Sequence, residues 1–194
     1  MRVLIVDDEP IIRMDLKEIL EEKGCIIIGE ASDGETAVHL SRSMKPDVVL
    51  MDIKMPGKMD GLQAAKRITE EEICPTVLLT AYNQQELVKE AASTVGIFAY
   101  LVKPIKEEDV LPALNLAVAK WKNYKEIKKE NRLLKTKLKN RKLIEIAKGI
   151  LMEKYNISER DAYRRIQKLS MDYRTDMVKI AKDIIVSDKL NKMI

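Results

Sequence analysis

The stretch VLIVDDEP, residues 3–10, decides the fold, because a short apolar run ends directly in two acidic residues. Such a run is typical of a β-strand that is covered on both faces. Four similar runs follow in the first half of the chain, and amphipathic stretches separate them. The five strand candidates are residues 3–6, 25–30, 47–51, 76–80 and 97–102.

The amphipathic stretches between these strand candidates have helical periodicity. They begin near Ile11, Gly34, Gly61, Gln84 and Glu107. Strands that alternate with helices predict an α/β fold with a parallel sheet and helices on both of its faces. In an open sheet of this kind, a functional site lies at the carboxyl ends of the strands.

Composition narrows the class of protein further. Hydrophobic residues make up 46% of the chain, which supports a real core, and the two cysteines lack partners at metal-ligand spacing. No apolar run approaches the roughly 20 residues that a membrane span requires, and the first apolar run is too short for a signal peptide. We therefore expect a cytoplasmic protein with reduced thiols and no membrane partner.

The net charge of +4 hides a strong asymmetry between the two halves of the chain. Residues 1–119 carry 13 basic and 21 acidic side chains, whereas residues 120–194 carry 22 basic and 10 acidic ones. This polarity predicts two domains, of which the second faces a polyanion. The alternative is a solvated basic helix that has no partner.

Residues 122–155 predict one long helix, because they contain no proline and a single glycine. With Asn131 at heptad position a, the apolar series contains Ile127, Leu134 and Leu138, with Tyr124 before them, and it fails at Arg141. An asparagine at position a favours a parallel, two-stranded coiled coil in a fixed register. The alternative is a single helix that is exposed to solvent.

Two shorter helices follow the long one. Ser158 is a candidate N-cap with Asp161 three residues later, and apolar residues at helical spacing follow. A further helix from about Arg174 carries an apolar face. Together with the end of the long helix, these segments predict a small three-helix bundle.

Five polar side chains fall at the ends of the predicted strands. Asp7 and Asp8 follow the first strand, Asp52 ends the third, Thr80 ends the fourth and Lys103 ends the fifth. Carboxylates that share one pocket repel one another unless a hard cation joins them, and Mg²⁺ suits such a site because it keeps waters for a phosphoryl oxygen. Acids that merely cap helices explain single members of this set but not all five residues.

The motifs LIVDDEP, VVLMDIKMP, LLTAY and AYLVKP occur in this order, and with them the chain resembles the receiver domain of two-component response regulators. The resemblance covers residues 1 to about 120 and implies a flavodoxin-like (βα)5 fold. It implies that Asp52 accepts a phosphoryl group from a sensor histidine kinase. Asp7, Asp8, Asp52 and the backbone carbonyl of Lys54 would then bind Mg²⁺.

The same resemblance assigns roles to three further residues. Lys103 would pair with the phosphoryl oxygens, Thr80 would bind them on activation, and Tyr100 would swing as Thr80 moves. A small Ala81 and a cis peptide between Lys103 and Pro104 are also implied. The loop MPGKMDG is one residue longer than the usual family loop, which affects the expected geometry of that loop.

The second half resembles the ANTAR domain, an RNA-binding output module of antitermination regulators, from roughly Arg141 to Val186. The matching elements are Ala147-Lys148-Gly149, Ile150-Leu151-Met152, Ala162-Tyr163, Ser170-Met171, Arg174 and Ile180-Ala181. The candidate RNA-binding residues are Lys148, Gly149, Arg160, Tyr163, Arg164, Arg165, Lys168 and Arg174.

Two of these candidates have alternative interpretations. Gly149 removes a side chain so that another backbone comes close, and that backbone belongs either to an RNA loop or to a neighbouring helix of the bundle. Tyr163 either stacks on a loop base or is a half-buried core residue. Arg164 and Arg165 are adjacent on a helix, so we expect only one of them to face RNA.

We therefore expect a receiver domain at residues 1–119, a coiled-coil linker helix at 120–140 and an ANTAR domain at 141–194. Phosphorylation would promote a homodimer through Ile127, Asn131, Leu134 and Leu138, and the dimer would bind RNA hairpins in a transcript leader and cause antitermination. The arrangement is similar to ethanolamine-utilisation antiterminators. The alternative is a phosphorylation-switched regulator whose helical output binds DNA or a protein. Phosphotransfer is expected only on the protein's own aspartate, so the chain is not predicted to be an enzyme for external substrates.

Overall fold

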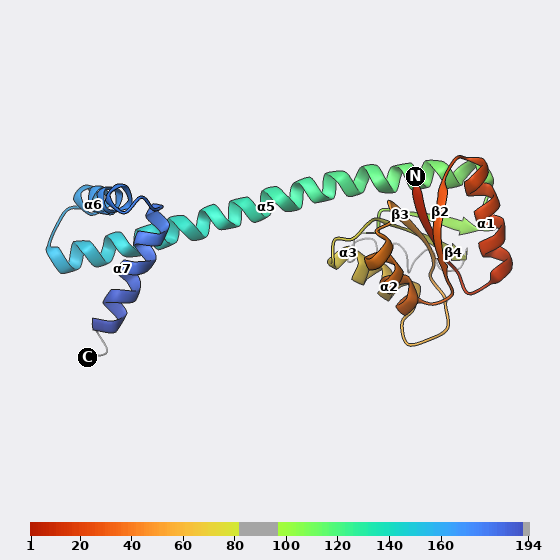
Figure 1. Ribbon diagram of the computed structural model, residues 1–194, viewed down its shortest axis with the longest axis horizontal. Coiled ribbons are helices and arrows are strands. Elements are labelled where there is room, and N and C mark those ends of the chain that lie inside the picture. The colour runs from red at the N-terminus through yellow and green to blue at the C-terminus, as the bar shows by residue number, and fades with distance from the viewer. Residues whose placement is uncertain (82–96, 192–194) are drawn as a thin grey trace. The chain divides into compact units, whose positions relative to one another are not determined.

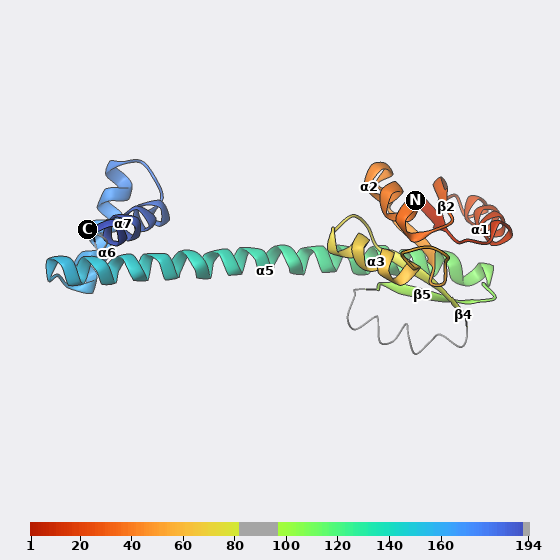
Figure 2. The same cartoon turned by 90° about the horizontal axis from the view of Figure 1, so that it is seen from below.

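The computed structural model describes residues 1–81 and 97–191 and forms two compact units, Met1–Glu126 and Ile127–Ile194. The amphipathic stretch that begins near Gln84 lies outside the described residues. Figures 1 and 2 show the chain in two views.

The first unit is built on a five-stranded parallel sheet with the order β2-β1-β3-β4-β5 (Figure 1). This sheet confirms the α/β fold class, and the strand bounds differ from the expected ones by at most two residues. The strands are β1 (Arg2–Val6), β2 (Ile26–Ala31), β3 (Val48–Asp52), β4 (Thr76–Ala81) and β5 (Ala99–Lys103).

Helices cover both faces of this sheet, as the sequence predicts. The helices described in this unit are α1 (Pro10–Glu22), α2 (Gly34–Met44), α3 (Gly61–Glu70) and the first part of α5 (Glu107–Tyr155). Each start has a local cause: Pro10 lies in the first turn of α1, and the side chains of Asp33 and Asp60 accept hydrogen bonds from backbone N–H groups of α2 and α3.

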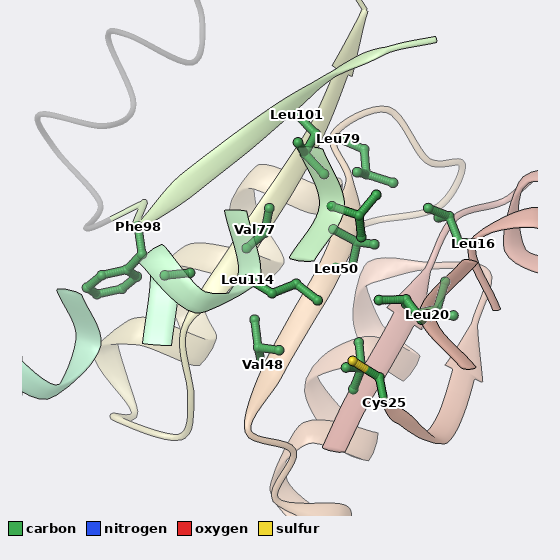
Figure 3. Close-up of a cluster of buried hydrophobic side chains, with 14 of the residues drawn as sticks. Leu16, Leu20, Cys25, Val48, Leu50, Val77, Leu79, Phe98, Leu101 and Leu114 are labelled. Atoms are coloured by element: carbon green, nitrogen blue, oxygen red, sulfur yellow. The ribbon is translucent and has the colours of Figure 1, made fainter. Parts of the chain in front are cut away.

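Alternate residues of the strands enter two separate hydrophobic clusters, because side chains of a strand point to opposite faces. Ile5 and Leu50 pack against α1 and α5, whereas Leu4 and Met51 pack against α2 and α3. Figure 3 shows the first cluster, in which Leu16 and Leu20 of α1 and Leu114 of α5 lie against β3 and β4. The central strand β3 is buried along its whole length, including its last residue, Asp52.

An aromatic group closes the first cluster at the edge of the sheet. The ring of Trp121 meets that of Phe98 edge-on at 5.2 Å between centroids and stacks on that of Tyr124 at 5.4 Å. Tyr124, which the heptad pattern places in the linker seam, therefore packs on the core of the first unit. Tyr124 packs on the indole ring of Trp121 and not in the seam, because the indole ring offers it a buried aromatic contact.

The second unit is a three-helix bundle with its own core, as expected. The end of α5 packs with α6 (Glu159–Asp172) and α7 (Met177–Asn191) around Ala147, Ala162, Ile166 and Ala181. Ser158 caps α6 by accepting from the backbone N–H of Asp161, which confirms the expected N-cap. α7 begins at Met177, and Asp176 caps it by accepting from the N–H of Lys179.

None of the helices in the described part of the chain is long and apolar enough to cross a membrane.

Candidate functional site

The carboxyl ends of β1, β3 and β5 bring Asp7, Asp52 and Lys103 together. The Nζ atom of Lys103 lies 2.8 Å from an Asp7 carboxylate oxygen and 2.7 Å from an Asp52 carboxylate oxygen. In the strand order of the sheet, β1 and β5 lie on either side of β3 and β4. Three segments that are far apart in the sequence therefore meet at the carboxyl edge of the sheet. Two acids and one ammonium group thus form a compact ionic cluster.

Burial and the neighbouring charges shift the pKa values of this cluster. Burial raises the pKa of Asp52, and the charge of Asp7 raises it further, although Lys103 and a hydrogen bond from the backbone N–H of Lys54 partly oppose the change. Burial alone lowers the pKa of Lys103, but hydrogen bonds to Asp52 and Asp7 outweigh it and raise that pKa overall. Lys103 therefore stays protonated. Its charge offsets only part of the effect of burial on Asp52, so the pKa of Asp52 stays raised.

Asp8 is placed differently from Asp7 and Asp52. It is exposed and lines a pocket of about 580 Å³ together with Lys54 and Asp60. Among the residues that the structure describes, no three Asp, Glu, His or Cys side chains are grouped closely enough to hold a metal ion. The expected convergence of three carboxylates is therefore seen for Asp7 and Asp52 but not for Asp8, which lines the pocket instead.

The donor set nevertheless fits a hard divalent cation. Asp7 and Asp52 already bind one cationic group between them, and Asp8 faces the adjoining pocket that Lys54 borders. Mg²⁺ is commonly bound by one or two carboxylates and several waters, so it does not require a preformed cage of three acids.

Thr80 lies on β4, between the strands that carry Asp52 and Lys103, and Tyr100 lies on β5, which also carries Lys103. Thr80 is fully buried at the end of β4, and its hydroxyl donates to the carbonyl oxygen of Ala81 at 3.1 Å. Tyr100 is 43% exposed on β5. The peptide bond between Lys103 and Pro104 is cis, as expected. The movement of Tyr100 with Thr80 stays a prediction.

The loop after β3 is held against Asp52 by a glycine. Gly61 donates its N–H to the carbonyl oxygen of Ile53 at 3.0 Å, and a Cβ at Gly61 would lie only 1.8 Å from the carbonyl oxygen of Asp52. Gly57, within the lengthened loop, has a φ of +120°, a conformation that side-chain-bearing residues rarely adopt. Gly57 thus accommodates the extra length of the loop. Gly61 allows the end of the loop to pass close to the backbone of Asp52.

Sequence reasoning missed Arg13, which holds the turn that carries the two acids. Its guanidinium donates to the carbonyl oxygen of Asp7 at 2.7 Å and to that of Asp8 at 3.4 Å, and it also pairs with Glu30. The available signal was an arginine one turn after the paired acids on a helix that starts there. Arg13 positions the Asp7 and Asp8 backbone and leaves their side chains for other ligands.

Lys148 does not belong to an exposed cationic face, which corrects its expected placement. Its side chain is only 8% exposed, and Nζ lies 2.8 Å from Glu145 and 2.6 Å from Glu159. Hydrogen bonds to Glu145 and Glu159 raise the pKa of Lys148, and the same lysine lowers the pKa of Glu159. Lys148 thus ties α5 to the first turn of α6.

Gly149 is exposed on α5, and apart from its chain neighbours and the backbone of its own helical turns, a Cβ built on it meets no atom of residues 1–81 and 97–191 within 4 Å. Of the two interpretations of this glycine, packing against a neighbouring helix of the bundle is therefore wrong. A glycine inside a helix costs about 1 kcal/mol relative to alanine, and no internal contact of the bundle offsets that cost.

A shallow groove on α6 gathers several of the candidate RNA-binding residues. Arg160, Tyr163 and Arg164 line it together with Lys148. Tyr163 is 45% exposed and is not among the described residues that form the hydrophobic cluster of the bundle; its stacking on a base stays a prediction. Lys168 and Arg174 are also exposed, and Arg174 lies in the turn before α7 with a φ of +48°.

Arg165 faces away from this groove. Its guanidinium carbon lies 4.2 Å from the centroid of the Tyr155 ring, in a cation–π contact. The adjacent Arg164 lines the groove instead. The two neighbouring arginines therefore point to different surfaces, as expected from their positions on one helix.

The apolar residues of the predicted linker seam lie open on α5. Ile127, Leu134 and Leu138 are 63%, 50% and 60% exposed, and Asn131 is exposed between them. Four residues of one helical face, three of them apolar, are thus available for a partner. Their pairing with a second chain stays a prediction.

Comparisons with known proteins agree with both halves of this structure. Residues 3–115 match the family model of the response regulator receiver domain, and residues 132–185 match that of the ANTAR domain. The solved receiver domain of a modulated diguanylate cyclase from Desulfovibrio desulfuricans superimposes with a TM-score of 0.58 at 30% identity, over 63% of this chain and 97% of that one.

Two curated relatives show how far the likeness extends. The transcriptional regulatory protein PdtaR of Mycobacterium tuberculosis is 46% identical over 184 residues, which cover 95% of this chain and 89% of that protein. The chemotaxis protein CheY of Thermotoga maritima is 41% identical over 115 residues, which cover 59% of this chain and 94% of that protein. The chain belongs to the two-component response regulators. Within them it is a member that carries an N-terminal receiver domain and a C-terminal ANTAR domain.

Proposed function

We propose that the protein is switched by phosphorylation of Asp52 and regulates transcription by binding RNA hairpins through its ANTAR bundle. The observation that carries this proposal is the pairing of two sites in one chain. One is the cluster of Asp7, Asp52 and Lys103, and the other is the basic, tyrosine-containing groove on α6. The name of PdtaR, a transcriptional regulatory protein, supports the same kind of output.

In the receiver domain, a carboxylate oxygen of Asp52 attacks the phosphorus atom of a phosphohistidine on a sensor kinase. The bond from phosphorus to the histidine nitrogen breaks, and the ammonium of Lys103 stabilises charge on the phosphoryl oxygens. When bound, Mg²⁺ would be held by Asp7, Asp8, Asp52 and the backbone carbonyl of Lys54, and it would supply further charge neutralisation. The hydroxyl of Thr80 then donates to a phosphoryl oxygen, and Tyr100 follows its movement.

In the second unit, the groove residues contact an RNA loop. Cations from Arg160 and Arg164 approach phosphates, and the exposed Tyr163 ring stacks on an unpaired base. Paired bundles in a dimer engage two hairpins, and the second engagement is intramolecular. A leader RNA held in this form does not fold its terminator, so transcription continues.

Dimerisation through the linker seam gives the first prediction. Leu134→Lys or Leu138→Lys should raise the dissociation constant of the phosphorylated dimer at least about 100-fold, because a charge in a heptad core must be desolvated. Sedimentation of protein treated with acetyl phosphate measures this change. Leu133→Lys is the matched control, since Leu133 is 55% exposed on the same helix but lies off the seam. Equal dimerisation of all three variants would place the dimer contact elsewhere.

The two adjacent arginines of α6 give the second prediction. Arg164→Ala should weaken hairpin binding and lower the salt slope of the affinity by about 1, because one phosphate contact is lost. Arg165→Ala should leave both quantities near those of the parent protein, because its guanidinium rests on Tyr155. Fluorescence anisotropy at several salt concentrations measures both. Equal losses in the two variants would contradict the assignment of the groove.

The decisive test of the function is a leader RNA whose loops are scrambled while its stems are kept. We expect the phosphorylated protein to prefer the native leader by at least about tenfold, since each base contact contributes roughly 1–3 kcal/mol. Equal affinity for both RNAs would refute hairpin recognition. Preferential capture of duplex DNA, or of a protein partner, would favour the alternative output for the same phosphorylation switch.

A further inference from the structure

The linker part of α5 within the second unit is almost purely cationic. Residues 128–142 contain eight lysines and arginines and a single acid, Glu130. Exposed helices are usually stabilised by pairs of opposite charge three or four residues apart. Here most charged neighbours at these spacings carry the same charge.

Five of these cations form one line on the helix surface. Lys128, Arg132, Lys135, Lys139 and Lys142 follow one another at intervals of four, three, four and three residues, which places them on one face. All are exposed except Lys128, which is half-buried. We call these five residues the cationic stripe.

If the same spacing is continued along α5, the line of the cationic stripe reaches Gly149 in the bundle. The next positions at the same intervals are Ile146, which is 52% exposed, and Gly149. A Cβ at Gly149 would have no atom of another described segment within 4 Å. From Lys128 to Gly149 the helix rises roughly 30 Å. The row of positive charges thus leads to Gly149, where no side chain covers the backbone of α5 and a ligand can come close to it.

We propose that the cationic stripe is a second RNA contact, which binds the phosphate backbone beside the loop that the bundle recognises. This inference rests on the proposed RNA-binding function and extends it to the linker. Neighbouring members of the stripe are about 5–6 Å apart, which is comparable to the spacing of successive phosphates along a nucleic-acid strand. Phosphates relieve the repulsion within the stripe, and the missing side chain of Gly149 lets the strand pass onto the bundle.

The contact is insensitive to base sequence, because lysine and arginine on a helix face meet phosphates and not base edges. It therefore sets affinity and salt dependence, whereas the groove on α6 sets the preference among loops. Arg132 and Lys139 lie at heptad position b, which points away from the predicted seam, whereas Lys128, Lys135 and Lys142 lie at position e, which borders it. The stripe therefore lies beside the predicted seam and extends away from it.

A matched pair of double variants tests this proposal. Arg132→Gln with Lys139→Gln removes one arginine and one lysine from the stripe. Lys137→Gln with Arg141→Gln removes the same two residue types from another face of the same segment. Glutamine is a good helix former, and circular dichroism and sedimentation check that helix content and oligomeric state match those of the parent. Affinity for native and loop-scrambled leader RNA is then measured against salt.

The stripe variant should bind both RNAs about tenfold or more weakly, with a salt slope lower by roughly 1.5 to 2, and should keep the parent's ratio between native and scrambled loops. The other variant should stay close to the parent. The loss should be greater for hairpins with long stems than for hairpins with minimal ones.

Equal effects of the two variants would overturn the proposal and leave the stripe as a solvated helix face. Stripe-dependent flotation on anionic phospholipid vesicles, with unchanged RNA binding, would also overturn it in favour of a lipid surface. A parent protein that does not distinguish native from scrambled loops would instead refute the proposed function, whatever the stripe variants do.

Discussion

Asp52→Asn is expected to abolish labelling of the protein by acetyl phosphate in Mg²⁺ buffer. The amide of asparagine is not a nucleophile, whereas the Asp52 carboxylate lies beside the ammonium of Lys103 at the sheet edge. Intact-mass spectrometry measures the labelling. Burial also raises the pKa of Asp52 above the ordinary value of an aspartate.

The same pKa shift predicts that the Asn variant stays folded. A raised pKa means that the folded state disfavours the ionised carboxylate, so stability falls as pH rises through that pKa, and the cost persists at neutral pH. Asn removes this cost. Asp60→Asn is the matched control, because Asp60 lies near the site but caps α3, and asparagine caps a helix equally well. Labelling of the Asp52→Asn variant, or loss of labelling in the control, would place the acceptor elsewhere.

Gly61→Ala is expected to destabilise the receiver domain by about 3 kcal/mol, at the upper end of the usual cost of overpacking. Its Cβ would lie 1.8 Å from the carbonyl oxygen of Asp52, and backbone cannot yield as a flexible side chain can. The clash falls on the acceptor residue itself, so labelling by acetyl phosphate should also slow. Urea unfolding followed by circular dichroism measures the stability change.

Gly149→Ala provides the contrast to Gly61→Ala. The same added methyl group meets no atom of another described segment there, and alanine is the better helix former, so this variant should gain up to about 1 kcal/mol. Similar losses of stability in both variants would show that the close contact at Gly61 is not the cause. A more stable Gly149→Ala protein that binds RNA less tightly would assign the glycine to close approach by RNA.

The sheet and the meeting of Asp7, Asp52 and Lys103 were predictable because hydrophobic periodicity is a local property and parallel strands share one carboxyl edge. The orientation of Asp8 was not, because adjacent residues of a strand end point to different sides, and the choice depends on Arg13 and on the neighbouring pocket. The close approach of Gly61 to Asp52 was also not predictable from the sequence, because it depends on the path of the lengthened loop between β3 and α3.

In the bundle, the sequence likewise predicts only some of the contacts of the charged side chains. The pairing of Lys148 with Glu145 is visible in the sequence as a spacing of three residues on a helix, but its pairing with Glu159 spans two helices and requires the structure. In the same way, the opposite directions of Arg164 and Arg165 followed from helix geometry, whereas the ring that receives Arg165 did not. Charge counts alone therefore overstate the number of cations that are open to a partner.

The aromatic group around Trp121 has a practical consequence for spectroscopy. Trp121 is the single tryptophan of the chain, is 7% exposed, and lies in the first unit, whereas the second unit contains only tyrosines. Emission excited selectively at tryptophan therefore reports the packing of the receiver alone, and it should shift to the red when Phe98 and Tyr124 leave the indole. Far-ultraviolet ellipticity instead averages over the helices of both units. Denaturation curves from the two signals coincide only if the units unfold together, so one unlabelled sample measures how strongly receiver and output depend on each other for stability.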